Sequence, residues 1–236
     1  MKTNLETYIQ VQKVCRDVLS EIGSLIKAGQ SELEIVNYCR ELIAAYGVHE
    51  YWYHNIPVMV ALGQHTMRSA TGKGYVASDQ LLADDDYFTI DLSLAINNHW
   101  GIYAKTFSVE SGMVRLADSS NDEFVQLKNI SETLHHYLLE IAHPDMTFHE
   151  LYHAINARVI SSKVLHLDFR GNFGHSIEQS LDARVYIENN SMQKISQSGL
   201  FGFEPHLRFI DGRIGFKDAD IYFFKSNKLH RLSEAC

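Results

Sequence analysis

The sequence predicts an α+β domain in which helices cover a curved antiparallel sheet and two similar halves follow each other. A helix-turn-helix pattern occurs twice, and each time strand-like segments follow it in which apolar and polar residues alternate. An order of two helices and then strands is typical of α+β folds. We therefore expect one domain over 1–236, with halves at about 1–117 and 118–236.

The first helix pair is predicted near the N-terminus. Val14, Val18 and Ile22 recur at the spacing of a buried helical stripe. The segment Ser31–Glu34 then has the form of a capping box, in which a serine and a glutamate three residues later satisfy each other's backbone N–H groups. A second helix is therefore expected to begin directly after the first has ended.

The same helix pattern returns in the second half. Leu127, Leu134 and Leu138 predict a long amphipathic helix. Thr147–Glu150 is again a capping box, so another helix follows after a tight turn. The two junctions are equivalent by pattern, although few of their residues are identical.

Strand patterns follow the first helix pair. Residues 87–94 alternate, with apolar side chains on one face and Thr89, Asp91 and Ser93 on the other. Residues 100–109 are expected to form the next strand of a hairpin. The first half therefore places a carboxylate on the polar face of its sheet.

Strand patterns also follow the second helix pair. Residues 200–206 place Glu204 and His206 on one face and phenylalanines on the other. Residues 221–224 are expected to form the last strand. Both halves thus carry titratable side chains on the polar faces of their strands.

Composition excludes several classes of function. The 236 residues are 45% hydrophobic and carry a net charge of -8 without a basic run, so nucleic acid is not an expected partner. No apolar run reaches the roughly 18 to 20 residues that span a bilayer, and the N-terminus lacks a signal segment, so we expect no membrane partner and a cytoplasmic protein. Cys15, Cys39 and Cys236 are scattered, which favours neither a disulfide framework nor a thiolate zinc site.

Five segments resemble the pita-bread family that includes methionine aminopeptidase, aminopeptidase P, prolidase and creatinase. They are Phe88–Ser93, Trp100–Phe107, Phe173–Glu178, Phe203–His206 and Gly215–Lys217. The resemblance covers nearly the whole chain, and it implies the pita-bread fold with two pseudo-symmetric halves. It also implies a short member without the additional N-terminal domain of aminopeptidase P and creatinase.

The metal-dependent members of that family hold two divalent ions with two Asp, one His and two Glu side chains. The resemblance assigns Asp91, His175 and Glu204 to three of these five positions. The second Asp is expected eleven residues after the first, where this chain has Ile102. An isoleucine has no donor atom, so this ligand is missing.

The position of the last Glu falls within 215–220. The sequence does not decide which residue occupies it, and the candidates are Lys217, Asp218, Ala219 and Asp220. Both departures concern bridging ligands, whose charge holds two ions together. A dinuclear site is therefore not expected. The implied cofactor is either none or a single zinc, iron or manganese ion at the three remaining ligands.

Creatinase resembles these peptidases in fold but breaks a C–N bond without metal, using His and Glu side chains. By this resemblance, His175, His206 and His65 are candidates for proton transfer, with Glu178 or Glu204 orienting them or sharing the proton. An imidazole suits this role because it titrates near neutral pH.

Four further residues are candidates for substrate contacts. They are Trp100, Tyr103, Arg68 and Lys217. Arg68 lies in a loop where relatives place substrate-contacting residues, whereas Trp100 is expected either to line a pocket mouth or to pack. An ammonium at Lys217 would neutralise the remaining carboxylates as the lost ions did.

These residues support an enzyme that acts on a small amino-acid-derived or amide-like substrate, or on a short peptide, through an altered centre. One alternative is a catalytically inactive binding module of the same fold. A second is an active metallo-aminopeptidase of the Xaa-Pro type whose missing ligands come from elsewhere. A homodimer is the assembly expected by resemblance.

Overall fold

The computed structural model describes residues 5–115 and 119–236. Its helices are α1 (Leu5–Leu25), α2 (Glu32–Ala45), α3 (Asp122–Ile141) and α4 (Phe148–Ser161). Its strands are β1 (Glu50–Tyr51), β2 (Val58–Leu62), β3 (Asp86–Leu92), β4 (Leu94–Ile96), β5 (His99–Trp100), β6 (Tyr103–Glu110), β7 (Met113–Arg115), β8 (Val164–His166), β9 (Leu200–Phe203), β10 (His206–Phe209), β11 (Phe216–Lys217), β12 (Asp220–Lys225) and β13 (Lys228–Arg231). Short 3-10 helices lie at Gly63–Met67, Leu181–Ala183, Ile195–Gln197 and Leu232–Ala235.

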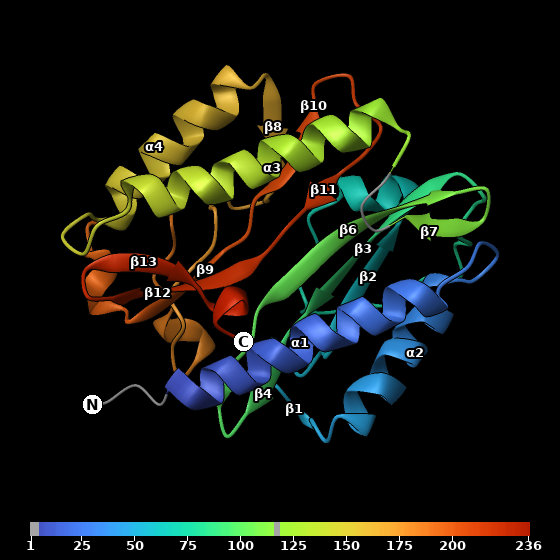
Figure 1. Ribbon diagram of the computed structural model, residues 1–236, viewed down its shortest axis with the longest axis horizontal. Helices are drawn as coiled ribbons and strands as arrows, with labels where there is room; N and C mark the ends of the chain where they lie inside the picture. The colour runs from blue at the N-terminus through green and yellow to red at the C-terminus, as the bar shows by residue number, and fades with distance from the viewer. Residues whose placement is uncertain (1–4, 116–118) are drawn as a thin grey trace.

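The strands form small antiparallel sheets that lie side by side (Figure 1). The first half contributes the sheet β2-β3-β6-β7 and a smaller one, β1-β4-β5. The second half contributes β11-β10-β8 and β13-β12-β9. Ala104 of β6 and Ala219 exchange backbone hydrogen bonds of 3.3 and 3.1 Å, which join the strands of the two halves.

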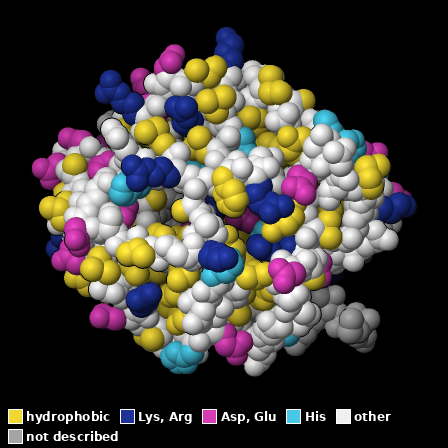
Figure 2. Space-filling view, turned by 180° about the vertical axis from the view of Figure 1, so that it is seen from behind, with side chains coloured by type: hydrophobic (Ala, Val, Ile, Leu, Met, Phe, Trp, Pro, Cys, Tyr) yellow, Lys and Arg dark blue, Asp and Glu magenta, His cyan; other side chains and the backbone are white. Residues whose placement is uncertain are grey.

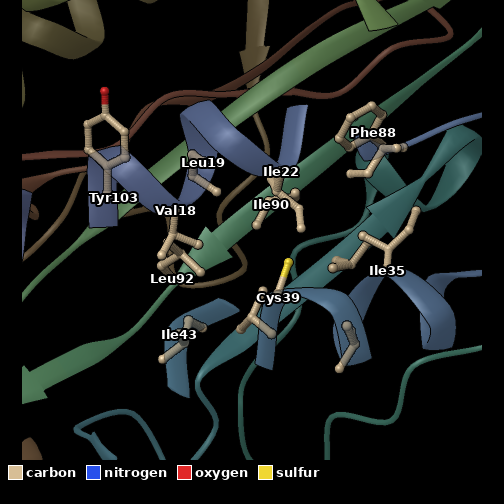
Figure 3. Packing of buried hydrophobic residues seen from close by; sticks show 14 of the residues in the cluster. Val18, Leu19, Ile22, Ile35, Cys39, Ile43, Phe88, Ile90, Leu92 and Tyr103 are labelled. Atoms are coloured by element: carbon tan, nitrogen blue, oxygen red, sulfur yellow. The ribbon is translucent and has the colours of Figure 1, made fainter. Parts of the chain in front are cut away.

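Each helix pair packs on the strands of its own half. Figure 3 shows Val18 and Ile22 of α1 and Cys39 of α2 directed toward Ile90 of β3. Cys39 is fully buried in this cluster. In a second cluster, aromatic side chains such as Phe148 pack with aliphatic neighbours from α3, α4 and the strands of the second half. Burying these side chains is the main favourable contribution to folding.

The predicted helix starts are confirmed. Ser31 and Thr147 both accept a hydrogen bond from the backbone N–H three residues later, and Glu34 and Glu150 return the contact to the capping residue's N–H. The first helix ends at Leu25, which is largely exposed rather than part of the buried stripe. No helix within 5–115 or 119–236 is both long and apolar enough to cross a membrane.

The strand predictions are right in place and wrong in extent. The segment 87–94 is divided into β3 and β4, and 100–109 into β5 and β6. The chain leaves the ladder at Glu204 and Pro205, between β9 and β10, because proline has no N–H to donate to a neighbouring strand. Residues 221–224 lie in β12, which is followed by one more strand, β13.

Candidate active site

A cavity of about 550 Å³ lies between the strands of the two halves. Figure 2 shows a hollow near the middle of the face opposite to that of Figure 1, with Lys, Arg, Asp and Glu side chains gathered around it. Its wall includes the residues to which the family resemblance assigns metal-ligand positions, together with one of the residues left open for the last position, namely Asp91, Ile102, His175, Glu204 and Lys217. Thr89 and Ser93, the polar neighbours of Asp91 on its strand, also line it. The polar face predicted for this strand therefore points into the cavity.

Lys217 places its ammonium between two carboxylates. Its Nζ lies 2.5 Å from Oδ2 of Asp91 and 3.5 Å from Oε2 of Glu204. The backbone of Lys217 is fixed as well, because its N–H donates to Oγ1 of Thr106 at 2.8 Å and its carbonyl accepts from the same hydroxyl at 3.0 Å. Hydrogen bonds to its backbone and ion pairs to its side chain thus fix the position of Lys217.

The charges of this cluster stabilise one another. Burial raises the pKa of Asp91, while the nearby Lys217 works in the opposite direction. Burial by itself would lower the pKa of Lys217, but the ion pairs with Asp91 and Glu204 outweigh burial and hold the pKa above its ordinary value. Lys217 is therefore an ammonium at neutral pH, and it carries the positive charge at this point of the cavity.

His175 directs an unprotonated nitrogen toward Glu204. Its Nδ1 donates to the carbonyl of Ser176 at 2.8 Å, which fixes the proton on that nitrogen and leaves Nε2 as an acceptor 3.6 Å from Oε1 of Glu204. Burial, with a further contribution from the charge of Arg184, lowers the pKa of His175 to about 3. The imidazole is consequently neutral in the physiological range.

Two glycines, Gly174 directly before this histidine and Gly202 on the neighbouring strand β9, let the backbones pack closely here. Gly174 has a φ of 133°, and a Cβ atom there would lie 2.1 Å from the carbonyl oxygen of Gly202. A Cβ on Gly202 would meet Cδ1 of Ile102 at 2.8 Å. The missing side chains thus permit the tight packing around His175 and Ile102.

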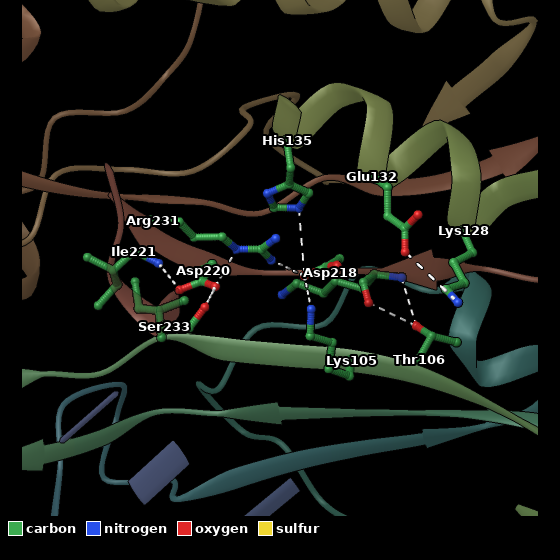
Figure 4. Close-up of polar contacts among 12 residues, drawn as sticks. Lys105, Thr106, Lys128, Glu132, His135, Asp218, Asp220, Ile221, Arg231 and Ser233 are labelled. Carbon is green, nitrogen blue, oxygen red and sulfur yellow. Dashed lines mark hydrogen bonds and ion pairs between the residues drawn. The ribbon is translucent and has the colours of Figure 1, made fainter. Parts of the chain in front are cut away.

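Asp218 and Asp220 do not line the cavity, and both carboxylates pair with basic side chains (Figure 4). Asp218 pairs with Lys105 at 2.7 Å and with Arg231 at 3.3 Å. Asp220 pairs with Arg231 at 2.6 Å and accepts from Gln12 at 2.8 Å. Of the four residues that the sequence left open for the last ligand position, only Lys217 reaches the cavity.

The side chains present do not fit a pair of divalent ions. In the described part of the chain, no three His, Cys, Asp or Glu side chains converge closely enough to hold a metal ion. Ile102 lines the cavity with hydrocarbon, which cannot bind an ion, and the ammonium of Lys217 already brings positive charge to Asp91 and Glu204.

A glutamate that sequence reasoning missed also lines the cavity. Glu32, whose side chain is only 4% exposed, accepts from Nδ1 of His65 at 2.7 Å and from the backbone N–H groups of Leu62 and Ser78 at 3.0 Å each. It therefore holds His65 in the tautomer whose Nε2 is an acceptor. The capping box explains Ser31 and Glu34 but assigns no role to Glu32, which directly follows the capping serine.

The structure brings some predicted site residues into the cavity and not others. His65, Arg68 and His206 line it together with the residues described above, and Nε2 of His206 donates to the carbonyl of Thr66 at 2.6 Å. Burial lowers the pKa of His206 to about 4. This histidine is neutral, like His175, and its Nε2 is already engaged.

Three predicted site residues do not line the cavity, namely Glu178, Trp100 and Tyr103. Trp100 is buried behind Trp52 and stacks on it with ring centroids 4.7 Å apart. Tyr103 packs in the core cluster of the first half. Trp100 in β5 and Tyr103 in β6 thus bury their side chains in apolar clusters, and Glu178 lies outside the strands.

Comparison with known proteins gives the family and the fold. The model of metallopeptidase family M24 matches residues 6–224. Solved structures with the same fold include an X-Pro aminopeptidase from Thermotoga maritima (18% identity, 97% of this chain and 60% of that chain covered, TM-score 0.78). They also include a prolidase from Pyrococcus furiosus (18% identity, 99% of this chain and 64% of that chain covered, TM-score 0.79). A third is a Xaa-Pro dipeptidase from Bacillus anthracis (16% identity, 99% of this chain and 61% of that chain covered, TM-score 0.79).

These likenesses confirm the predicted pita-bread fold and, at such low identity, show the fold alone. The chain spans about 60% of the length of the solved structures that it matches. No curated protein matches it. Because the family model matches most of its length, the chain belongs to metallopeptidase family M24.

Proposed function

We propose that this member of the M24 family is a metal-independent enzyme that hydrolyses a C–N bond in a small amino-acid-derived amide or a short peptide. The observation that carries the proposal is the ammonium of Lys217 between Asp91 and Glu204. It supplies positive charge where relatives require ions, so the two carboxylates are balanced without a metal. The cavity nevertheless keeps a histidine and a glutamate open to a ligand.

His175 and Glu204 are the groups proposed to move protons. Nε2 of His175 is unprotonated, faces the cavity and takes a proton from water while the water oxygen bonds to the carbonyl carbon of the substrate. The proton then passes to the leaving nitrogen as the C–N bond breaks, which gives a free acid and an amine. The carbonyl of Ser176 orients the imidazole through Nδ1, and Glu204 attracts the positive charge that the ring gains when it takes the proton.

Turnover without metal is the test of this proposal. Protein purified without chelators is analysed for metal and then assayed against short peptides and amides with and without EDTA. We expect EDTA to leave the rate unchanged, and His175→Gln and Glu204→Gln to lower it by roughly 100-fold or more, the usual contribution of a positioned acid or base. His153→Gln, on the exposed surface of α4, is the matched control and should be without effect.

Two results would overturn the metal-independent mechanism. One is two equivalents of tightly bound metal together with loss of activity in EDTA, which would restore the alternative of an active Xaa-Pro-type metallo-aminopeptidase. The other is full activity in both the His175 and the Glu204 variants. The engagement of Asp218 and Asp220 with Lys105 and Arg231 argues against that alternative, since neither is free to replace a ligand.

A binding module is the second candidate, and the pairing of Lys217 with both carboxylates favours it, because paired carboxylates are less available for chemistry. Saturable binding of short peptides with no turnover under any condition would support this candidate over the enzyme. The expected homodimer and cytoplasmic location stay predictions, and light scattering of the purified protein tests the assembly.

A further inference from the structure

Four carboxylates contribute to the wall of the cavity, and three of them have a basic partner. Glu32 is hydrogen-bonded to a histidine. Asp91 and Glu204 share the ammonium of Lys217. The fourth carboxylate, Asp168, forms no ion pair with a basic side chain in the described part of the chain. A half-buried carboxylate without a counter-charge is stabilised by a cation that arrives from solution.

One oxygen of Asp168 is saturated, and the other is free. Oδ1 accepts from the backbone N–H of Arg170 at 2.9 Å, and from the backbone N–H and Nδ2 of Asn172 at 3.2 and 2.8 Å. Oδ2 has no hydrogen-bond partner among the described residues, and it is not one of their polar atoms that are shielded from water. The carboxylate is therefore fixed in orientation and keeps a single open oxygen.

The arginine nearest to Asp168 in sequence is engaged elsewhere. Cζ of Arg170 lies 4.3 Å from the ring centroid of Tyr186, and its guanidinium makes a 4.0 Å contact with Glu188. Burial raises the pKa of Asp168, while the backbone N–H groups that bond to Oδ1 work in the opposite direction. A cation bound at the open oxygen would offset the cost of burying this charge.

A hydrogen-bonded link ties Asp168 to the proposed site of chemistry. Asn172, which donates to Asp168, accepts through Oδ1 from the backbone N–H of Gly174 at 2.9 Å. Asn172 is only 7% exposed, so water does not compete for these bonds. Gly174 directly precedes His175 in the sequence, and both Asp168 and His175 line the cavity. The open oxygen is thus held at a fixed position relative to His175, and one substrate can contact both.

We propose that Oδ2 of Asp168 binds an ammonium group of the substrate whose amide lies at His175. The proposal rests on the proposed function in that the ammonium belongs to the substrate of the same cavity. A single open oxygen suits an ammonium, which is a compact donor. A guanidinium suits it less well, because its planar fork binds two acceptor oxygens at once. The substrate class is therefore an amide or short peptide with a free amine.

Three small amides that differ in one group test this ammonium subsite. Alanine amide carries an ammonium, lactamide has a hydroxyl in its place, and 2-guanidinopropanamide has a guanidinium. Their dissociation constants are measured by NMR titration at about pH 7, where most of the amine is protonated.

The titrations are made on the unaltered chain, on Asp168→Asn and on Asp86→Asn. Asparagine keeps an oxygen that can accept the three hydrogen bonds of Oδ1 and removes only the charge. Asp86 is the matched control, because its carboxylate also accepts backbone N–H groups, those of Ala83 and Tyr87, but does not line the cavity.

We expect alanine amide to bind about tenfold or more tightly than either of the other two amides, as a charge-assisted hydrogen bond would provide. Asp168→Asn should remove its advantage over lactamide, whereas Asp86→Asn should keep it. Asp168→Glu, which keeps the charge on a longer side chain, should retain part of the advantage. Urea unfolding shows whether each variant is folded, and if Asp168→Asn is not, the ratios in the unaltered chain and in Asp168→Glu decide.

The ammonium subsite is rejected if alanine amide binds no more tightly than lactamide, or if its advantage survives in Asp168→Asn. Binding of the guanidinium as tightly as the ammonium would also reject it. These measurements need no turnover. Absence of hydrolysis would therefore reject the proposed function and leave the subsite intact, while loss of the preference would reject the subsite whatever the enzyme activity.

Discussion

At the scale of single residues, Lys217 combines two roles that are separate in a metalloenzyme. It is a structural cation that balances Asp91 and Glu204, and it is part of the wall that a ligand would contact. Its side chain is 19% exposed, so the ion pairs are only weakly screened by water. Removing its charge should therefore affect the stability of the whole domain.

The substitution Lys217→Met keeps the length of the side chain and removes the charge. We expect it to lower the free energy of unfolding by about 3–5 kcal/mol at pH 7, because the buried Asp91 and the partly buried Glu204 lose their partner. The matched control is Lys194→Met, whose partner Asp145 is 79% exposed, and its cost should stay within about 1 kcal/mol. If urea unfolding shows equal losses of free energy in the two variants, Lys217 does not balance the charges of Asp91 and Glu204.

Restoring the two absent carboxylates should restore a metal site. In Ile102→Asp/Lys217→Glu, all five side chains at the cavity wall become possible ligands. We expect this double variant to bind two equivalents of Mn²⁺ or Zn²⁺ in calorimetric titration, and the unaltered chain to bind neither ion tightly. Tight binding by the unaltered chain would contradict this reading of the cavity.

Sequence patterns predicted the site only where a motif singled a residue out. Asp91, His175 and Glu204 stood in segments shared with relatives, and all three meet at the cavity wall. Glu32 has no such motif, because its role depends on a loop 30 residues later folding back onto the start of α2. The choice of Lys217 over its neighbours depended on strand register, which the sequence left open.

At the scale of elements, the two capping boxes are the clearest local signals. Thr147 is the N-cap of α4, and its exposed hydroxyl accepts from the N–H of Glu150 at 3.1 Å. We expect Thr147→Ala to lower the free energy of unfolding by about 1 kcal/mol, because an N–H of the first turn loses its partner. Thr133→Ala, at an exposed position inside α3, is the control and should be nearly neutral. Similar losses in both variants, measured in urea, would contradict a capping contribution.

Strand extents were predicted less well because side-chain alternation says nothing of where a ladder stops. The alternation of residues 200–206 continues through Glu204 and Pro205, although the backbone leaves the sheet there. Glu204 and His206 nevertheless line the same cavity, as the alternation predicts. The pattern of side chains was therefore a better guide to the site than to the strand boundary.

At the scale of the whole molecule, buried histidines make stability depend on pH. Burial lowers the pKa of His135, His166 and His175 to about 3 and that of His206 to about 4. In the unfolded chain these groups titrate near 6.5. The unfolded state therefore binds more protons below that pH, so stability is complete above it and falls as the pH falls toward 4.

The expected slope of the unfolding free energy is up to about 1.4 kcal/mol per pH unit for each of these histidines. Urea midpoints measured between pH 8 and pH 4 test this. They should be level at the alkaline end and drop steeply below pH 6. A midpoint that stays constant down to pH 4 would show that these imidazoles are hydrated in the folded state.

The two halves share a cavity, and the ion pairs of Lys217 link them there. This link makes the folded state independent of the supply of metal ions. Lys217 is made with the polypeptide, so the charge between the halves is present as soon as the chain folds. For a protein that needs a bound ion, the folded state gains stability only in proportion to the logarithm of the free ion concentration. In this protein the cation is the ammonium of Lys217, which is covalently part of the chain, so its contribution to stability does not depend on the concentration of any ion in solution. Thermal unfolding should consequently occur at the same temperature in EDTA and in millimolar Mn²⁺, and the protein would remain ready to bind its substrate when metal is scarce.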